Sequence, residues 1–508
     1  MAILIVVNNP NDWPLDIPGV DVVSARSYLI ETQYSDMRGA KVFNLCRSYR
    51  YQSFGYYVSL LAAARGHKPL PSITTIQDLK LQTMIRLASD DLNDLIQSSL
   101  SRTHSGTFEL SIYFGRNLAK KYDRLSLALF NLFPAPLLRA KFEYKPDGDG
   151  AGRSGSAGNI REDSGGAWEL KTLQPIPASE VPPDHWLFVL YAANVYFIGR
   201  GPAKNKPQPV RYDLAILYNE QEESSPSNAG AIKKFVKAAK EVGFSPEVIG
   251  KDDYGRIAEF DALFIRETTS VNHYTYRFSR RAAAEGLVVI DDPVSIVRCT
   301  NKVYLAELLY RHEIKAPRTM IVHQGNMDEV PLWVGFPCVL KIPDSAFSKG
   351  VVKAVGPRDL REYLDSMLEK SDLVIAQEWL PSDFDWRVGV FNGKVLFTCK
   401  YHMVRGHWQI VGSENGEKQF GKVETMPVEA APRRVVQIAL KTANLIGNGL
   451  YGVDLKQVGG KVYVMEVNDN PNIDSGYEDR ALKGELYRVI MQTMMDRVVA
   501  SRTIAGGK

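Results

Sequence analysis

Two apolar segments joined by two glycines near the carboxyl end constrain this sequence more than any other feature. Residues 451–458 and 461–468 each have the pattern of a β-strand, and Gly459-Gly460 between them favours a tight antiparallel hairpin. Side chains alternate between the two faces of a strand, so one face of the second strand is predicted to carry Val462, Val464, Glu466 and Asn468. The hairpin therefore predicts an antiparallel sheet that presents a carboxylate and an amide together.

The loop length of this hairpin decides which residue lies opposite Asp454 on the first strand. A two-residue turn would pair Asp454 with Met465, whereas a three-residue loop that includes Lys461 would pair it with Glu466. We predict the three-residue loop. Directly paired side chains have Cβ atoms roughly 4.5 to 5.5 Å apart, so two carboxylates there would repel unless a cation lay between them. Mg²⁺ fits, because it prefers oxygen ligands and shared nucleotide phosphates.

A plainer interpretation is that these acids form a solvated edge of the sheet. Asn468 on the same face, followed by Asp469-Asn470-Pro471-Asn472, argues against it. The sequence has no His or Cys cluster that would compete as a metal site.

Upstream residues could supply cations for nucleotide phosphates. Lys341 ends a predicted strand, 337–342, and the small-residue loop 343–350 follows it. The backbone amides of this loop, with Ser348 and Gly350, could fold over a triphosphate while Lys341 provides a point charge. The loop is not a Walker sequence, because it lacks the Gly-Lys-Ser/Thr ending and no helix follows.

A further strand, 373–379, leaves its sheet at Leu380-Pro381 and would expose backbone groups suited to an adenine edge. Asp385 could then accept hydrogen bonds from ribose hydroxyls. Arg387, Lys400 and Arg405 would gather positive charge where a phosphoryl group is transferred. Each of these three could equally be a surface cation on a hairpin.

The 508 residues exceed what one core can hold, since single cores stop growing near roughly 250 to 300 residues. We expect an amino-terminal α/β domain over 1–200, with a mobile Gly/Ser-rich loop at 147–166. Strands at 214–218, 262–265 and 287–290, alternating with helices, predict a small parallel-sheet domain over 210–298. Residues 299–500 mix hairpins with helices and carry nearly every motif, so the fold class is α/β, with an α+β carboxy-terminal part.

Bulk properties narrow the class of protein. A net charge of +4 does not indicate nucleic-acid binding, and the widely spaced Cys46, Cys299, Cys338 and Cys399 suggest reduced core residues. The apolar stretch 186–198 is shorter than the roughly 20 residues that cross a bilayer. Without a secretion signal or a membrane segment, we expect a cytoplasmic protein.

Taken in order, several blocks resemble the ATP-grasp superfamily, most closely its RimK-type glutamate ligases, over roughly residues 212–490. The blocks are Asn301-Lys302, Val339-Leu340-Lys341, Gln377-Glu378-Trp379-Leu380, Asp385-Trp386-Arg387, Gly452-Val453-Asp454 and Glu466-Val467-Asn468. Residues 1–200 resemble the amino-terminal extension of some RimK-like ligases, through Tyr49 to Tyr57 and the run to His67. The resemblance implies an ATP-grasp fold preceded by a small parallel-sheet domain and this extension.

The resemblance also implies an activity, in which ATP phosphorylates a carboxylate and an amine attacks the acyl phosphate to give an amide, ADP and phosphate. Its cofactors would be ATP and Mg²⁺, with Mn²⁺ as a substitute. Its substrates would be an amino acid or other carboxylate donor and an amine acceptor, either a small molecule or a protein tail, and we expect a homo-oligomer. By the resemblance, Lys302 and Lys341 would bind ATP phosphates, the segment Glu378, Trp379 and Leu380 would hold adenine, Asp385 would bind ribose, and Asp454, Glu466 and Asn468 would hold Mg²⁺.

One departure leaves the substrate open. The family's Gly-Asp-Phe-Arg-Ser-Asn segment corresponds here to 406–411, Gly-His-Trp-Gln-Ile-Val, which lacks the Arg and the Asn. Either Arg405 and Lys400 compensate or the substrate differs from glutamate. Two alternatives follow: an ATP-binding regulatory protein without turnover, or an enzyme that acts only on a macromolecule recognised by the amino-terminal domain.

Overall fold

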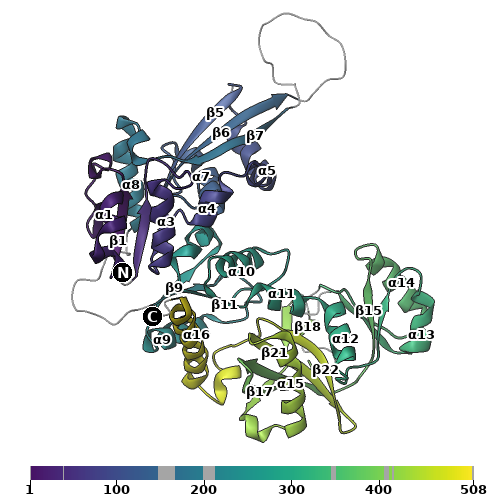
Figure 1. Ribbon diagram of the computed structural model, residues 1–508. Coiled ribbons are helices and arrows are strands. Elements are labelled where there is room, and N and C mark those ends of the chain that lie inside the picture. Colours follow the sequence, from purple (N-terminus) through teal and green to yellow (C-terminus); the bar gives the residue numbers. More distant parts are fainter. Residues whose placement is uncertain are drawn as a thin grey trace, which may run out of the picture. The chain divides into compact units, whose positions relative to one another are not determined.

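The computed structural model describes residues 2–37, 39–103, 105–146, 166–197, 212–344, 350–404, 411–414 and 417–505. These fall into two compact units (Figure 1). Unit 1 comprises Met1–Val210 and Asp252–Glu259, and unit 2 comprises Arg211–Lys251 and Phe260–Lys508. The loop predicted at 147–166 lies outside the described residues except for Gly166, which begins a strand. The predicted division of 210–500 into two domains stays a prediction.

Unit 1 contains a parallel sheet with strand order β2-β1-β3-β4. The strands are β1 (Ala2–Val7), β2 (Val20–Ser24), β3 (Ala40–Asn44) and β4 (Lys68–Leu70). The side chains of residues 3–7 are all buried, as a central parallel strand requires, and this explains its unbroken apolar sequence. The helices beside and after these strands are α1 (Ala25–Ile30), α2 (Thr32–Ser35), α3 (Phe54–Ala64), α4 (Ile73–Asp78), α5 (Gln82–Asp91) and α6 (Asn93–Leu100).

Helix α3 has a distinct residue at each end. The hydroxyl of Ser53 caps its first turn, and Gly66, with a φ of 70°, follows its end in the left-handed conformation that glycine favours. A short connection at 79–81 separates α4 from α5, and Leu81, whose backbone is extended, directly precedes the first residue of α5.

An antiparallel sheet, β5-β6-β7, completes unit 1. Its elements are β5 (Thr107–Tyr113), β6 (Leu137–Pro146) and β7 (Gly166–Pro175), with α7 (Asp123–Leu132) and α8 (Trp186–Phe197). The apolar stretch noted at 186–198 forms α8, whose residues Val189, Ala192 and Ala193 are buried in the core of unit 1. Among the described residues, no helix has both the length and the hydropathy of a membrane span.

Residues 252–259 belong to unit 1, although the sequence places them between two strands of unit 2. Glu259 is 3% exposed, and its Oε2 lies 3.1 Å from the Nζ of Lys41 on β3. The Nζ of Lys68 on β4 donates to the Glu259 carbonyl at 2.6 Å, and the hydroxyl of Tyr196 donates to Oε1. This late segment therefore supplies a buried carboxylate to the parallel sheet of unit 1.

Unit 2 begins with a second parallel sheet, of order β9-β8-β10-β11. Its elements are β8 (Tyr212–Leu217), β9 (Phe244–Ile249), β10 (Ala262–Ile265) and β11 (Val288–Ile290), with α9 (Ala229–Glu241), α10 (Tyr274–Ala284) and α11 (Pro293–Thr300). The first strand is flanked by the second on one side and the third on the other, as in unit 1. The chain thus uses the same four-strand layout twice.

The rest of unit 2 contains two larger antiparallel sheets, with orders β12-β15-β13-β14 and β20-β17-β16-β21-β22, and the two-stranded antiparallel sheet β18-β19. The first comprises β12 (Thr319–Val322), β13 (Cys338–Lys341), β14 (Val351–Ala354) and β15 (Val374–Glu378). The second comprises β16 (Phe384–Phe391), β17 (Lys394–His402), β20 (Val423–Met426), β21 (Leu450–Val458) and β22 (Lys461–Asn468). The remaining elements are α12 (Lys302–Arg311), α13 (Val330–Trp333), α14 (Pro357–Leu368), β18 (Val411–Glu414), β19 (Glu417–Phe420), α15 (Arg433–Ile446) and α16 (Gly484–Ala505).

The four cysteines are free and buried, as the sequence predicted. Burial raises the pKa of the Cys46 and Cys399 thiols to about 12, so these two stay protonated at neutral pH.

Replacing Glu259 by alanine should destabilise unit 1, because the half-buried Lys41 would lose its carboxylate and the Tyr196 hydroxyl would lose its acceptor. The loss of these interactions should cost about 1 to 3 kcal/mol. Hydrogen exchange of the β3 and β4 amides, followed by mass spectrometry, should show faster exchange in Glu259→Ala than in Asp253→Ala, a substitution in the same segment. Equal protection in the two variants would mean that the Glu259 contacts do not stabilise the sheet.

Candidate functional site

The β21–β22 hairpin does not have the predicted loop length, although it has the predicted residue pairing. Its turn has two residues, Gly459 and Gly460, with φ angles of 56° and 75°, so the three-residue loop is wrong. Asp454 nevertheless pairs with Glu466, as predicted. The register shifts between Asp454 and Leu455, where a β-bulge at Met465 adds one residue to β22.

The same bulge reverses the alternation of side chains along β22. Val462 and Val464 before the bulge and Val467 after it all lie in one hydrophobic core. The prediction that the first two valines share a face with Glu466 is therefore wrong. Strict alternation fails because a bulge puts two consecutive residues on the same side of a strand.

Arg387 on β16 is the direct partner of Asp454. Its Nε donates to Oδ1 and its Nη2 to Oδ2, both at 2.7 Å, which is the two-pronged geometry of a strong guanidinium–carboxylate pair. Burial opposes the charge of Arg387, but Asp454 outweighs it and holds the pKa of Arg387 well above its ordinary value. The side-chain amide of Asn468 donates to Asp454 Oδ2 at 3.1 Å. Asp454 and Asn468 are therefore in contact, as predicted, and Arg387 is hydrogen-bonded to the same carboxylate.

Glu466 lies beside the two lysines that the sequence assigned to phosphates. The Nζ of Lys302, the first residue of α12, is 3.4 Å from Glu466 Oε1. Lys341, at the end of β13, donates to Gln377 Oε1 at 2.8 Å. Burial lowers the pKa of Lys341, and the nearby charges of Glu466 and Lys302 act on it in opposite directions. Lys302, Lys341 and Glu466 are therefore neighbours in the fold.

These lysines line a cavity of about 410 Å³. Gln377 of β15 and Met465 of the bulge line it too, with apolar residues that include Ile375 and Pro317. A cavity of this size, with polar groups among apolar side chains, is typical of small-molecule sites.

Asp385 pairs with Lys456, which sequence reasoning did not assign. Lys456 Nζ lies 2.5 Å from Asp385 Oδ1 and 2.6 Å from the hydroxyl of Ser382. Lys456 is two residues after Asp454 on β21, so strand alternation could have identified it. Gln377 and Met465 were also missed, and for Met465 the signal is absent, since a bulge is not visible in the sequence.

Lys400 does not join this group. The β16–β17 register pairs it with Trp386, whereas Arg387 pairs with Cys399. Its Nζ lies 4.9 Å from the ring centroid of Phe384 and 5.2 Å from that of Trp386. Successive residues of a strand face opposite sides, so Lys400 lies on the other face of the sheet from Arg387 and its predicted place beside Arg387 is wrong.

The segment predicted to hold adenine begins at Glu378, the last residue of β15. The backbone N–H groups of Glu378 and Trp379 donate to the carbonyls of Arg318 and Pro337 at 2.9 and 3.2 Å, and the Nζ of Lys353 lies 3.9 Å from the ring centroid of Trp379. The carboxylate of Glu378 also pairs with Arg318. Leu380 follows this segment, half-buried, and its adenine contact stays a prediction.

Three predicted residues lie at or beyond the edge of the described chain. Gly350 has a φ of 70°, and its carbonyl accepts from the Ile342 N–H at 3.1 Å. Ser348 and Arg405 lie outside the described residues, as does the departing segment 406–410. The described residues contain no cluster of three or more His, Cys, Asp or Glu side chains able to hold a metal. The predicted set differs from such a cluster, since it consists of two carboxylates and one amide.

The chain after Asn468 is hydrogen-bonded to the residue that follows β10 of the small parallel sheet in unit 2. Arg266, which is 0% exposed, follows β10 and donates to Asn470 Oδ1 at 2.6 Å and to the Pro471 carbonyl at 2.8 Å. The next residue, Glu267, is 1% exposed, and burial raises its pKa to about 7. Its Oε2 accepts from the Tyr274 hydroxyl.

Glu267 should make the stability of unit 2 depend on pH. The unfolded carboxyl titrates near 4.5 and the folded one near 7, so the stabilising neutral form is fully present below pH 4.5 and is lost as the pH rises through 7. Glu267→Gln should therefore gain stability relative to the natural chain between these values, by about 3 kcal/mol at most. The difference in melting temperature between Glu267→Gln and the natural chain, at pH 5 and at pH 7.5, measures this gain in stability. Glu220→Gln, an exposed substitution after β8, is the control, and parallel pH profiles for the Glu267→Gln variant and the natural chain would contradict the expectation.

Two family models and several known proteins match parts of this chain. Residues 25–191 match the model of the RimK-like ATPgrasp N-terminal domain, and residues 299–490 match that of the RimK-like ATP-grasp domain. A probable alpha-L-glutamate ligase of Maridesulfovibrio salexigens is 26% identical over 45% of this chain and 74% of its own length. One from Vibrio vulnificus is 27% identical over 46% and 77%. The D-alanine–D-alanine ligase of Bacillus anthracis superposes with a TM-score of 0.44 at 15% identity, covering 58% of this chain and 99% of that one.

The two family matches occupy both units in the order expected from the sequence, and the second contains the lysines, the arginine and the paired acids described above. The chain belongs to the RimK-like ATP-grasp family.

Proposed function

We propose that this protein joins a carboxylate to an amine through an acyl-phosphate intermediate, and that its donor or its acceptor is an amino acid. The pairing of Asp454 with Glu466 carries the proposal, because two facing carboxylates next to two lysines suit a cation–triphosphate complex. The names of the relatives, probable alpha-L-glutamate ligases, support glutamate as the first amino acid to test.

The residues present fit a hard divalent cation. Asp454, Glu466 and Asn468 offer carboxylate and amide oxygens on adjacent strands, the donor type that Mg²⁺ prefers. In the structure the cations beside these acids are Arg387 and Lys302. Mg²⁺ held by these three residues would neutralise phosphate charge during transfer.

The protein side chains would contribute positioning and charge. Lys302 and Lys341 would bind the triphosphate, with its base in the segment that ends at Leu380 and its ribose at Asp385. An oxygen of the substrate carboxylate then forms a bond to the γ-phosphorus while the bond from that phosphorus to the β–γ bridging oxygen breaks, releasing ADP. Arg387 would stabilise the charge that develops on the transferring group.

Amide formation completes the reaction. The neutral amine attacks the acyl carbon, phosphate leaves with the former carboxylate oxygen, and the amine nitrogen loses one proton. No protein nucleophile is needed, so catalysis rests on orientation and electrostatics.

A phosphate-release assay with ATP, Mg²⁺ and an amino-acid panel tests the reaction class. We expect phosphate and ADP only when a carboxylate and an amine are both present. ATP binding without product across the panel would favour the regulatory alternative. If the acceptor is a macromolecule, intact-mass spectrometry of captured proteins should instead show added amino-acid masses.

Glu466→Gln should reduce Mg²⁺-dependent turnover by about 100-fold or more while the melting temperature stays close to that of the natural chain, because the carboxylate serves a cation and not the core. Steady-state kinetics over a range of Mg²⁺ concentrations measures the loss. Glu424→Gln, an exposed substitution on β20 of the same sheet, should keep full turnover. Unchanged kinetics in Glu466→Gln would remove Glu466 from the cation site.

Lys341→Ala should weaken ATP binding by roughly 10- to 100-fold, the range expected for one charge-assisted hydrogen bond. Lys400→Ala is the matched control, since this lysine lies on the other face of its sheet and should leave ATP affinity within about twofold. Isothermal titration calorimetry compares them. Equal affinities in the two variants would contradict the assignment of Lys341 to phosphate.

A further inference from the structure

The Arg387 guanidinium has a second neighbour besides Asp454. Its Cζ lies 4.9 Å from the ring centroid of Tyr401 on β17. Tyr401 is two residues after Cys399, the partner of Arg387 in the ladder, so the phenol ring lies on the same face of the sheet as the guanidinium. An aromatic ring at this distance attracts and supports a planar cation.

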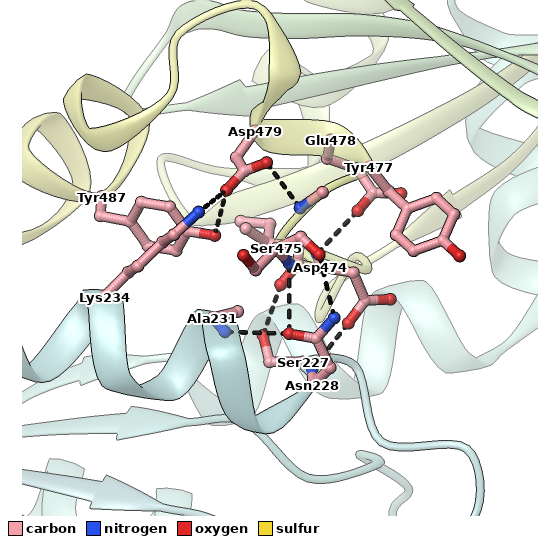
Figure 2. Close-up of polar contacts among 12 residues, drawn as sticks. Ser227, Asn228, Ala231, Lys234, Asp474, Ser475, Tyr477, Glu478, Asp479 and Tyr487 are labelled. Atoms are coloured by element: carbon pink, nitrogen blue, oxygen red, sulfur yellow. Dashed lines mark hydrogen bonds and ion pairs between the residues drawn. The ribbon is translucent and has the colours of Figure 1, made fainter.

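The hydroxyl of Tyr401 donates to Oε1 of Glu478. Glu478 is 2% exposed, and its Oε2 accepts from the backbone N–H of Asp474 at 2.7 Å (Figure 2). Both carboxylate oxygens are therefore engaged, one by the phenol and the other by the chain after β22. Arg387 thus donates directly to Asp454, and its other neighbour, the Tyr401 ring, is itself bonded to Glu478.

The segment that carries Glu478 is itself held against the start of α9 (Figure 2). Asp474 Oδ1 accepts from the Asn228 N–H at 2.6 Å, and the Asn228 side chain bonds to the N–H and the carbonyl of Ser475, each at 3.2 Å. At the other end, Asp479 Oδ2 pairs with Lys234 Nζ at 2.5 Å. The carboxylate of Glu478 therefore has a fixed position from which to hold the phenol.

We propose that Tyr401 and Glu478 are positioning residues for Arg387. The inference rests on the proposed function for the role of Arg387 and goes beyond it. When Asp454 binds a cation, its oxygen atoms bond to that cation as well, and its hydrogen bonds to Arg387 become weaker. The Tyr401 ring, fixed by Glu478, then keeps the guanidinium aimed at the transferring phosphoryl group.

Tyr401→Phe tests this by keeping the ring and removing the hydroxyl. The first measurement needs no turnover. In protein labelled with ¹⁵N-arginine, the Nε–H signal of Arg387, assigned by its absence in Arg387→Lys, should shift or broaden in Tyr401→Phe. An unchanged signal overturns the proposal. Should Tyr401→Phe not fold, Glu478→Gln tests the same hydrogen bond from its other end by the same signal.

Thr425→Val is the matched control. The Thr425 hydroxyl donates to the Tyr477 carbonyl at 2.7 Å, so it anchors the same segment from β20. If Tyr401 only anchors this segment, the two variants will change the Arg387 signal alike, which contradicts the proposal. If Tyr401 positions Arg387, only Tyr401→Phe will change it.

Turnover supplies the second measurement. In Tyr401→Phe we expect kcat to fall about tenfold, with KM for ATP within twofold, because one hydrogen bond to a charged group is lost. Combined with Arg387→Lys, the two effects should be non-additive, as expected for residues that act through one another. Additive effects contradict the positioning role. If the natural chain shows no turnover but the Arg387 signal still shifts in Tyr401→Phe, the proposed function is refuted and the positioning role is retained.

Discussion

The candidate site depends on one unfavourable interaction, the placement of two carboxylates opposite each other on neighbouring strands. Asp454 and Glu466 would repel in an unpartnered hairpin, and each has a cation beside it, Arg387 and Lys302 respectively. The two cations come from different elements, one from the neighbouring strand and one from the first residue of α12. Charge balance at this pair therefore fixes how the hairpin, the helix and the sheet meet, and it leaves positive groups where phosphates would bind.

The bulge at Met465 is the structural device that makes this arrangement compatible with a core. With a two-residue turn, an uninterrupted ladder would have paired Asp454 with Met465. One extra residue in β22 restores the acid pair and keeps Val464 and Val467 in the core on the other face. It also leaves Met465 at the wall of the cavity. A single irregularity thus serves packing, charge and the shape of the site together.

Part of the fold and of the candidate site could be predicted from the sequence, because side-chain alternation and turn residues are local signals. They identified the hairpin and the strand that ends at Lys341. The pairing of Asp454 with Glu466 was also predicted, but from a three-residue loop, whereas the structure reaches it through a two-residue turn and a bulge. Local signals failed where tertiary register decides, as with Lys400, whose face is set by its pairing with Trp386 and not by its charge. The Arg387–Asp454 contact joins residues 67 positions apart, and no local pattern encodes it. The place of Gln377 needed the same three-dimensional information, whereas alternation along β21 would have identified Lys456.

Segment 252–259 has a consequence for biosynthesis. The ribosome makes the strands of unit 1 first, yet the Glu259 carboxylate that neutralises Lys41 emerges only after β8, α9 and β9 have been made. Domains usually fold as they leave the ribosome, amino-terminal end first. Here the contacts of Glu259 with β3 and β4 can form only after synthesis has passed residue 259, so the parallel sheet of unit 1 gains its last partner when part of unit 2 has already been made.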